Sequence, residues 1–348
     1  MAFAGSLIVA VTGATGLVGR RLVQDLSLDG RIERVVAVGR NAGALEELAS
    51  ADRDKISFAI ADINDIEALR KAFDGCAVVV HAAGFVDPLA DREAIFKVNV
   101  QGTRCAIDAA TQAGCKQFIQ ISSLSVITGQ GDQYDLDESA PLVMCGENYA
   151  DSKVEAEKTA HQMLDGNLSL GDEALQLTIL RPGFIYGPHE QAWMPRLLNS
   201  IRSGQAALID GGKRMTNVVY VGNLSRAVSL SLLNPKAYGQ DFNITDGQKI
   251  SKKDLFDALA DGMGYPRVTR KIPRPLFAMA SAVVSKIAPH LSVEARTKLA
   301  RFSPGAFRLA AVNQGFSIKK AENLLNYVDR IPFATAMKDT LQYFKAEK

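Results

Sequence analysis

The chain has 348 residues, of which 47% are apolar and 22% are charged, and its formal net charge at pH 7 is +2. This composition is that of an ordinary globular protein with an ample core. The nearly balanced charge gives no reason to expect nucleic acid or an acidic partner. At this length we expect a core domain with a smaller domain appended to it.

Cysteine usage and hydropathy indicate a reducing compartment and no membrane span. The four cysteines (Cys76, Cys105, Cys115 and Cys145) show neither C-x-x-C pairing nor metal-ligand spacing, so we expect small apolar side chains and no metal site. The N-terminal residues MAFAGSLIVAVTG lack the basic region of a signal peptide. No stretch of the sequence reaches the ~18 apolar residues of a membrane span, and we predict a cytoplasmic protein.

One segment, PLFAMASAVVSKIAP at 275–289, is apolar nearly all round until Lys286. A buried helix is the simplest interpretation of this pattern. Contact with a membrane surface and a subunit interface are the alternatives.

Short β-branched apolar runs alternate with amphipathic stretches through the first half of the chain. The runs lie at 6–11, 34–39, 55–61, 77–83, 116–123 and 175–182. Strands that are buried on both faces and alternate with helices are typical of a parallel, doubly wound sheet. The predicted fold class is therefore α/β with a Rossmann-type sheet.

The regular alternation ends after Pro188. Strand-like runs return at 217–223 and 240–247, and the chain from 249 onward has a helical pattern. The sequence thus predicts a second, smaller and mainly helical lobe that covers the crevice of the sheet and binds substrate. We assign 1–187 with 217–247 to the sheet domain, and 188–216 with 248–348 to the lobe.

The first strand leads into VTGATGLVGRRL, in which Gly13, Gly16 and Gly19 are spaced three residues apart. A strand, a glycine turn and a helix in this order present a helix N-terminus and backbone N–H groups to a pyrophosphate. A Cβ at Gly13 or Gly16 would hold the phosphates off, and Gly19 allows the helix to pack tightly on the sheet. We predict a dinucleotide site here, with a tight turn that binds nothing as the alternative.

The second strand ends at VGRN, about 20 residues past Gly19, where an NAD site usually carries an acidic residue for the ribose 2′-hydroxyl. Here Gly39 takes that place and Arg40 follows it. Because arginine can hold a 2′-phosphate through two charge-assisted hydrogen bonds, we favour NADP(H), with NAD(H) as the alternative. Asp62, at the end of the third strand, is placed either to meet the adenine edge or to cap a helix.

Serines and a tyrosine–lysine pair follow the fifth strand. Ser122, Ser123 and Ser125 leave this strand in ISSLSV, at the edge where the crevice of such a sheet opens. In NYADSK, Tyr149 and Lys153 stand four residues apart and project from one face of a helix. A lysine charge about 5 Å away would lower the pKa of the tyrosine by about two units, which suits Tyr149 to act as acid or base for a hydroxyl–carbonyl pair. Ser123 can hold the same oxygen.

These motifs resemble those of the extended short-chain dehydrogenases/reductases. The matching stretches are TGATGLVG, DI at 62–63, HAAG at 81–84, NVQGT at 99–103, ISSLSV, YADSK, LRPGFIYGP at 180–188 and NVVYVGN at 217–223. They occur in the order that the family shows. The resemblance implies a Rossmann domain, a C-terminal substrate lobe, bound NAD(H) or NADP(H), and a Ser–Tyr–Lys centre.

The resemblance also implies roles for individual residues. Ser123 would donate a hydrogen bond, Tyr149 would be the acid/base, and Lys153 would support Tyr149 electrostatically and bind the nicotinamide ribose. Asn99 matches a position that supports the active-site helix. Asn148 departs from the pattern, because family members often have proline there. The cofactor site would comprise Gly13, Thr15, Gly16, Leu17, Val18, Gly19, Arg40, Asp62, Ile63, Ala82, Ala83, Gly84, Asn99, Ser122, Tyr149, Lys153, Pro182, Gly183, Phe184 and Ile185.

Within the family, VVYVGNLSRAV and LRPGFIYGP look most like the 3β-hydroxysteroid dehydrogenase branch, which includes bacterial reductases of long-chain β-keto acids. After Ser123, SVITGQG lacks the V-Y-G of many sugar enzymes, and Leu124 and Ser125 stand where dehydratases tend to carry an acidic pair. We therefore predict an NAD(P)-dependent oxidoreductase, expected as a homodimer, that interconverts a secondary alcohol and a ketone on a small apolar substrate. The alternatives are a nucleotide-sugar epimerase or dehydratase that retains its cofactor, and a non-catalytic NAD(P)-sensing protein.

Several other side chains are open to more than one interpretation. His81 is expected to pack and hydrogen-bond rather than to catalyse. Trp193 could line the substrate pocket or pack in a core, and Tyr186 is expected at the edge of the cofactor pocket. A substrate carboxylate or diphosphate, or only solvent, could surround Arg196, Lys213 and Arg214.

Overall fold

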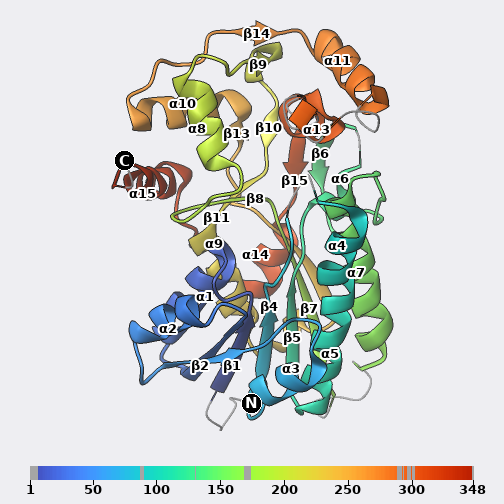
Figure 1. The fold of residues 1–348 in the computed structure, drawn as a ribbon, viewed down its shortest axis with the longest axis vertical. Coiled ribbons are helices and arrows are strands. Elements are labelled where there is room, and N and C mark those ends of the chain that lie inside the picture. Colours follow the sequence, from blue (N-terminus) through green and yellow to red (C-terminus); the bar gives the residue numbers. More distant parts are fainter. Residues whose placement is uncertain are drawn as a thin grey trace.

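A seven-stranded sheet forms the lower part of the molecule in Figure 1. The structure, a computed structural model, describes residues 7–86, 90–129, 131–167, 174–287, 292, 294–295, 299 and 302–346. The strands of the sheet are β1 (Leu7–Thr12), β2 (Ile32–Gly39), β3 (Ile56–Ile60), β4 (Val78–His81), β5 (Gln117–Ile121), β7 (Gln176–Pro182) and β12 (Gln240–Ile244). Their order is β12-β7-β5-β4-β1-β2-β3, and every neighbouring pair is parallel. Each apolar run predicted as a strand in the first half of the chain overlaps one of these strands, so the predicted parallel sheet is confirmed.

Alternate residues of the strands supply two apolar cores, one on each face of the sheet. In β1, Val9 and Val11 belong to one core and Ala10 to the other, because successive side chains of a strand point to opposite faces. The first core is closed by α1 (Leu17–Ser27), α2 (Ala42–Ser50), α9 (Val221–Ser231) and α14 (Lys319–Leu325). The second is closed by α3 (Ile66–Ala72), α5 (Gly102–Gln112) and α7 (Asn148–Leu164). Short helical segments complete this domain: α4 (Arg92–Phe96), η1 (Lys97–Gln101), α6 (Ser125–Thr128) and η4 (Pro235–Ala237).

The upper lobe surrounds a third apolar core (Figure 1). Its helices are α8 (Met194–Arg202), η3 (Asp210–Gly212), α10 (Lys252–Met263), α11 (Arg274–Ile287), α13 (Pro304–Ala311) and α15 (Phe333–Ala346). Its strands pair two by two: β10 (Met215–Thr216) with β13 (Ile250–Ser251), β14 (Lys271–Ile272) with β9 (Leu208–Ile209), and β15 (Gln314–Phe316) with β6 (Gln133–Leu136). The ends of α10 follow from its sequence, since Ser251 and Asp254 form a capping box and Gly264 ends the helix in the left-handed conformation.

A short parallel pair, β8 (Phe184–Tyr186) and β11 (Val218–Tyr220), joins the sheet domain to the lobe. The Tyr186 hydroxyl donates to Asp246 Oδ2 at 2.8 Å, and Asp246 Oδ1 accepts from the Tyr220 N–H at 2.8 Å and from Asn223 Nδ2 at 2.7 Å. The sequence predicts Tyr186 at the edge of the cofactor pocket, whereas its side chain is fully buried in the core of the lobe. Its role is therefore to hold the junction together.

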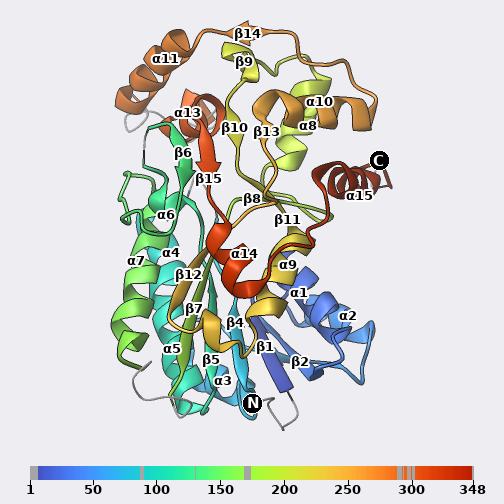
Figure 2. The same ribbon diagram turned by 180° about the vertical axis from the view of Figure 1, so that it is seen from behind.

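Residues around α14 pack with the sheet rather than with the lobe (Figure 2). Ile318, Ala321, Leu325 and Tyr327 belong to the core that is also lined by β1 and α1. The predicted lobe, 248–348, therefore contains a segment that returns to the sheet domain.

Helix α11 covers most of the apolar segment 275–289, of which residues 288 and 289 lie outside the described residues. The structure shows a helix that is buried on one side only. Phe277, Ser281 and Val284 are buried, whereas other side chains of the helix are exposed. No helix among the described residues has the length and apolar character needed to cross a bilayer.

Substitution of Leu325 tests the packing of α14 on the sheet. Leu325 is 2% exposed, so we expect Leu325→Ala to lower the free energy of unfolding by about 2–5 kcal/mol. The control Leu28→Ala truncates a side chain that is 82% exposed and should change this free energy by no more than about 0.5 kcal/mol. Urea unfolding followed by circular dichroism measures both, and equal midpoints for the two variants would contradict the packing described.

Candidate active site

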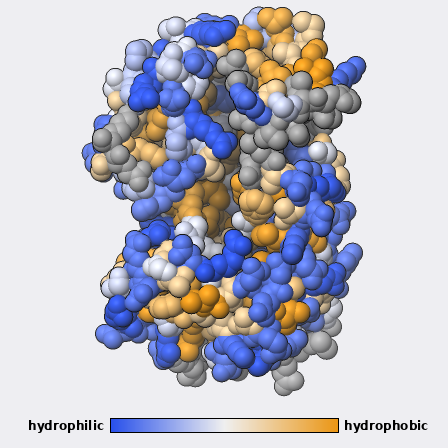
Figure 3. Space-filling view, viewed as in Figure 1, coloured by the Kyte–Doolittle hydropathy of each residue, from blue (hydrophilic) through white to orange (hydrophobic). Residues whose placement is uncertain are grey.

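The carboxyl ends of the parallel strands face the lobe. Figure 3 shows a hollow between the sheet domain and the lobe, with apolar surface inside it. The glycine loop after β1, the serines after β5 and the segment after β7 all leave the sheet at this edge. Because ligands of doubly wound sheets bind outside the carboxyl ends of the strands, this edge is the candidate site.

The loop between β1 and α1 has the geometry of a phosphate cradle. Gly13 has a φ of +66°, and a Cβ there would lie 2.7 Å from Ala83 Cα. A Cβ at Gly19 would lie 2.1 Å from the Gly13 carbonyl oxygen, so glycine at 19 lets α1 pack tightly, as predicted. Within the described residues, no side chain caps α1 at Gly16 and its first turn contains no acidic residue. The N–H groups at this helix end are therefore available to an anion, and the loop fits a pyrophosphate.

His81, at the end of β4, has the structural role predicted for it. Its Nδ1 lies 3.0 Å from Thr12 Oγ1 and its Nε2 lies 3.2 Å from Thr103 Oγ1. Burial, with a smaller effect from the Lys153 charge, lowers the pKa of His81 to about 3, so the ring is neutral. Thr12 Oγ1 also accepts from the Ala83 N–H at 3.3 Å, which fixes the predicted cofactor residues at 82–84 beside the glycine loop.

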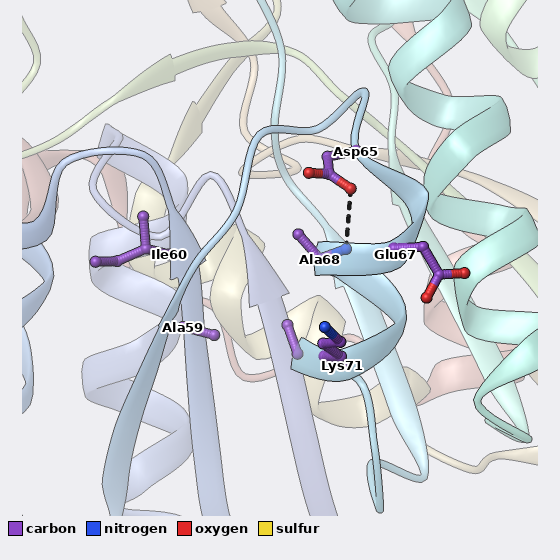
Figure 4. A pocket seen from close by; sticks show the side chains of 7 residues that line it. Ala59, Ile60, Asp65, Glu67, Ala68 and Lys71 are labelled. Carbon is purple, nitrogen blue, oxygen red and sulfur yellow. Dashed lines mark hydrogen bonds between the residues drawn. The ribbon is translucent and has the colours of Figure 1, made fainter.

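Arg40 and Asp62 face each other across the ends of β2 and β3. Arg40 Nη1 lies 3.8 Å from Asp62 Oδ2, and the two side chains are 78% and 48% exposed. The pKa of Asp62 is lowered, mainly by hydrogen bonds from Asn64 and in part by the Arg40 charge. Asp62 does not cap a helix: Figure 4 shows Asp65 at the start of α3, accepting from the Ala68 N–H at 3.0 Å. The helix-cap alternative for Asp62 is therefore wrong. The side chains of Arg40 and Asp62 both remain at the rim of the crevice.

Figure 4 also shows a depression in the surface beside β3, which is an edge strand of the sheet. It is lined by Ala59, Ile60, Asp65, Glu67, Ala68, Lys71 and Ala72. Asp65 is occupied as the helix cap, and Glu67 forms an ion pair with Arg70 at 3.4 Å. Two of its charged groups therefore already have structural partners.

Ser123, Tyr149 and Lys153 come together at the end of β5. Ser123 follows β5, and Tyr149 and Lys153 lie one turn apart in α7. The side chains of Ser123 and Tyr149 hydrogen-bond to each other. Lys153 Nζ donates to the Ile121 carbonyl oxygen at 2.9 Å and lies 3.5 Å from where a Cβ of Gly84 would be. The predicted constellation is thus assembled at one edge of the sheet.

The protonation of this pair differs from the prediction. Burial raises the pKa of Tyr149 to about 12, and the hydrogen bond with Ser123 only partly opposes this. Burial lowers the pKa of Lys153 to about 8, and the carboxylate of Glu157 opposes that change. For the groups that the chain itself supplies, the expected lowering of the Tyr149 pKa by about two units is therefore wrong, because the loss of hydration on burial dominates. At neutral pH Tyr149 is protonated and Lys153 is mostly charged.

Asn99 lies in η1, a π-helical turn, and links two segments of the site. Its Oδ1 accepts from the Phe85 N–H at 2.7 Å, and its Nδ2 donates to the Phe85 carbonyl at 3.2 Å and to Ser152 Oγ at 2.9 Å. Ser152 is the neighbour of Lys153 in α7. Asn99 therefore holds the loop after β4 against α7, which fits the supporting role that the resemblance implies.

The start of α7 is fixed without the proline that is common in the family. Asn148 is the first residue of the helix, and its side-chain amide lies 3.4 Å from the Ala90 carbonyl oxygen. The buried carboxylate of Asp151 accepts from the Cys145 N–H at 2.8 Å. Tyr149 is thus held between two anchored positions of the first helical turn.

A buried ionic cluster lies between α7 and the neighbouring strands of the sheet. Glu157, one turn after Lys153, is fully buried. Arg181 Nη2 donates to Glu157 Oε2 at 2.7 Å and to Asp241 Oδ2 at 2.6 Å. The Ser122 hydroxyl also donates to Glu157. The sequence predicts Ser122 as a cofactor contact, whereas its hydroxyl is directed at this carboxylate, so a side-chain contact to a cofactor is not supported.

Sequence reasoning missed Glu157 and Arg181. The available signal for Glu157 is its position four residues after Lys153, on the same side of the helix. Arg181 stands in the LRPG motif, directly before the segment expected to flank the nicotinamide. Neither signal shows that the two meet, because their contact depends on how α7 packs against β7.

The segment 182–185 is held between the sheet and the lobe. A Cβ at Gly183 would lie 1.8 Å from the carbonyl oxygen just before β11, so the backbone passes there without a side chain. The rings of Phe184 and Trp193 are 4.7 Å apart, and Trp193 Nε1 donates to the Ile185 carbonyl at 2.9 Å. Trp193 therefore has a packing role that supports this segment.

Other predicted cofactor residues contribute to packing around the crevice. Leu17 packs against the core of the lobe, whereas Val18 and Ala82 pack against the first core of the sheet. Ile63 packs on the second core, close to the start of α5, where a Cβ at Gly102 would lie 2.9 Å from its Cγ2. Leu17 thus connects the glycine loop to the lobe.

Of the three lobe cations considered as substrate contacts, Arg214 is paired with acidic side chains of the chain itself. Arg214 Nη1 donates to Asp210 Oδ2 at 2.9 Å, and its Nε lies 3.7 Å from Asp132. Arg196 and Lys213 are exposed. The charge of Arg214 is therefore already neutralised by the chain.

Comparison with known proteins agrees with this arrangement. Residues 10–274 match the sequence model of the 3-beta hydroxysteroid dehydrogenase/isomerase family. The chain belongs to this family. Members of the 3-beta hydroxysteroid dehydrogenase/isomerase family are extended short-chain dehydrogenases/reductases, so the protein is an oxidoreductase of this class.

Relatives and solved structures match nearly the whole chain. The chain is 29% identical to 3beta-hydroxysteroid-dehydrogenase/decarboxylase isoform 1 of Arabidopsis thaliana, over 96% of this chain and 79% of that protein. It is 26% identical to 2-alkyl-3-oxoalkanoate reductase of Shewanella oneidensis, over 94% of this chain and 84% of that protein. The structure of dTDP-glucose 4,6-dehydratase from Streptomyces venezuelae, with NAD bound, covers 98% of this chain and 97% of its own, with a TM-score of 0.74 and 21% identity. At that identity the likeness shows the Rossmann-type fold alone.

Glu157→Gln tests the link between the buried cluster and Lys153. The Glu157 carboxylate raises the pKa of Lys153, which burial lowers to about 8, so its loss should lower that pKa further. Lys153 would then lose its proton at lower pH, and the alkaline limb of the kcat profile should move to lower pH. The control Glu155→Gln lies on the same helix, where its partner is Lys158, and should leave the limb unchanged. Superimposable profiles for wild type and Glu157→Gln would rule out this link.

Proposed function

We propose that this protein is an NAD(P)-dependent dehydrogenase/reductase that interconverts a secondary alcohol and a ketone on an apolar substrate, of the 3β-hydroxysteroid or long-chain β-hydroxy/β-keto type. The observation that carries the proposal is the meeting of Ser123, Tyr149 and Lys153 at the edge of the sheet where the glycine loop lies. A protonated phenol, a hydroxyl and an ammonium group at one site are suited to move a proton to and from a carbonyl oxygen.

A dinucleotide would lie in the crevice. The N–H groups at the start of α1, next to Gly13, would hold the pyrophosphate, and Lys153 would meet the nicotinamide ribose. When bound, the nicotinamide would accept or donate the hydride of the substrate carbon. The rest of the chemistry, which is proton transfer and orientation of the oxygen, belongs to the chain.

In the reducing direction, Tyr149 Oη donates its proton to the substrate oxygen while Ser123 Oγ holds the same oxygen by a hydrogen bond. The raised pKa of Tyr149 keeps the proton on the phenol at neutral pH, which is the form that this direction needs. The ammonium group of Lys153 stabilises the phenolate that is left. In the oxidising direction, the phenolate takes up the hydroxyl proton, and this direction is favoured at higher pH.

Two observations support an apolar substrate rather than a nucleotide sugar. The curated relatives carry the names of enzymes for hydroxysteroids and for alkyl-oxoalkanoates. In the lobe, Arg214 is already paired with Asp210 and Asp132, so one of the cations that could meet a diphosphate is neutralised.

The proposal places the enzyme in a reducing compartment such as the cytoplasm, as a homodimer. The thiols of Cys76 and Cys115 are buried, and burial raises the pKa of each to about 12. Thiols of this kind are inert packing groups rather than redox centres. Light scattering on the purified protein measures the oligomeric state.

Tyr149→Phe tests the catalytic assignment. Without the phenolic proton, we expect kcat to fall by about 10²–10⁴-fold while binding of the dinucleotide is retained. Absorbance of the reduced nicotinamide, followed with steroids, β-keto acids and UDP-sugars, measures the rate and identifies the substrate class. The control Tyr134→Phe changes a tyrosine that is 74% exposed and should keep the wild-type rate.

Two outcomes would contradict the proposal. A Tyr149→Phe variant as fast as wild type would remove the acid/base role. Conversion of a UDP-sugar without net change of the cofactor would instead favour the epimerase alternative.

Arg40→Ala tests the preference for NADP(H). Loss of charge-assisted hydrogen bonds to a 2′-phosphate should weaken NADP binding about tenfold or more, and leave NAD binding nearly unchanged. Asp62, 3.8 Å from Arg40, would then stand unopposed and repel the phosphate. Titration of intrinsic fluorescence with each dinucleotide measures the two affinities. The control Arg34→Ala removes an exposed arginine of β2, the strand that Arg40 follows; equal changes in NADP and NAD affinity for Arg40→Ala would overturn the assignment.

A further inference from the structure

Helix α7 carries a row of ionisable side chains spaced four residues apart. After Tyr149 the row continues through Lys153, Glu157 and His161 to Asp165, the residue that ends the helix, so each side chain lies next to the one before it. The side chains of Asp165 and His161 are 62% and 28% exposed, whereas that of Glu157 is 0% exposed. The row therefore leads from solvent to the candidate active site.

The neighbouring strands add two charges that connect the members of this row. Arg181 Nη2 donates to Glu157 Oε2 at 2.7 Å and to Asp241 Oδ2 at 2.6 Å, so one guanidinium group is divided between two carboxylates. Asp241 Oδ1 lies 3.2 Å from His161 Nε2. Figure 2 shows α7 beside β12 and β7, the strands that carry the aspartate and the arginine. Direct contacts thus run without a break from His161 to Glu157, one turn from Lys153.

His161 is charged at neutral pH. Its Nδ1 lies 2.7 Å from Asp165 Oδ1, so both nitrogens of the ring face a carboxylate oxygen. The hydrogen bond with Asp241 raises the pKa of His161 to about 9; burial opposes this change and Asp165 adds to it. The four groups that the contacts join, from His161 to Glu157, therefore alternate between positive and negative charge.

Other ionisable groups surround these contacts without interrupting them. Burial raises the pKa of Glu138, which follows β6, and the nearby charges of Lys320 and Arg181 oppose this in part. Lys320, on α14, also acts on Asp241, whose pKa is lowered mainly by the hydrogen bond with His161, against the effect of burial. The ring of His81, which faces α7 from β4, is neutral. The direct path between the two carboxylates consists of the guanidinium group alone.

We propose that Asp241 and His161 are positioning residues for the proposed reaction, which act through the buried ionic cluster to set the protonation of Lys153. Asp241 draws the guanidinium group away from Glu157 and adds a negative charge of its own, so it helps Lys153 to keep its proton. His161 acts in the opposite sense, because its positive charge neutralises Asp241. The inference rests on the proposed function, in which the ammonium group of Lys153 stabilises the phenolate of Tyr149.

The alkaline limb of the kcat profile tests this assignment through opposite movements. Eight residues of α7 separate Lys153 from His161, about 12 Å, and at an effective dielectric of about 20 a charge at this distance moves a pKa by about one unit before screening by salt. Asp241→Asn should therefore move the limb to lower pH, and His161→Gln should move it to higher pH, each by about half a pH unit or more. The double variant Asp241→Asn/His161→Gln should return the limb toward its wild-type position, since it removes one charge of each sign.

The matched controls are Glu155→Gln and Lys158→Gln, which remove one charge of each sign from a solvent-exposed pair on the same helix. Both should leave the limb in place. Loss of packing alone would lower kcat at every pH and would not move the limb in two directions. If Asp241→Asn does not fold, the upward movement in His161→Gln decides, because that side chain lies near the surface. A limb that stays in place in His161→Gln, or that moves the same way in both variants, overturns the proposal.

Nuclear magnetic resonance of Lys153 tests the same link without any measurement of activity. In protein with 13C-labelled lysine, Lys153→Met identifies the Lys153 signal, which should titrate near pH 8 in the wild type, well below the ordinary value of about 10.4. The pKa of Lys153 should fall in Asp241→Asn and rise in His161→Gln. An unchanged pKa in His161→Gln would refute the inference whatever the enzyme does. The expected changes of this pKa together with an unmoved kcat limb would instead refute the role of Lys153 in the proposed function.

Discussion

The buried ion pair of Glu157 and Arg181 fixes the edge of the sheet at which the candidate site lies. A charge removed from water is costly unless a partner compensates it closely, so this pair tolerates little displacement of α7 against β7. Ser122 binds the same carboxylate directly before Ser123, and Arg181 directly precedes Pro182. The two loops that frame the candidate site therefore take their positions from one carboxylate.

Much of the fold and of the candidate site follows from local features of the sequence. Buried parallel strands give continuous apolar runs, and the glycines of the first loop are required where a Cβ would strike the backbone, as at Gly13 and Gly19. Tyr149 and Lys153 are recognisable because helix geometry places them one turn apart. Long-range contacts could not be predicted in this way. The return of α14 to the sheet and the meeting of Glu157 with Arg181 depend on packing between elements far apart in the chain.

The pKa of Tyr149 shows why a local estimate failed. Spacing in a helix gives the distance between two charges, but the cost of removing a phenolate from water depends on everything packed around it. Here that cost is the larger effect, and Lys153 is itself bonded to the Ile121 carbonyl. The protein scaffold thus supplies a proton donor, while the ionised form needs an additional positive charge nearby. The Glu157 carboxylate opposes the effect of burial on the pKa of Lys153, so it helps that side chain to keep its proton.

Helix α11 shows the limit of hydropathy as a guide to burial. Its sequence is apolar on nearly every side, a pattern that is the same whether the second side meets protein or lipid. The structure shows which side the lobe covers, through Phe277 and Val284, and which side it leaves exposed, through Met279 and Val283.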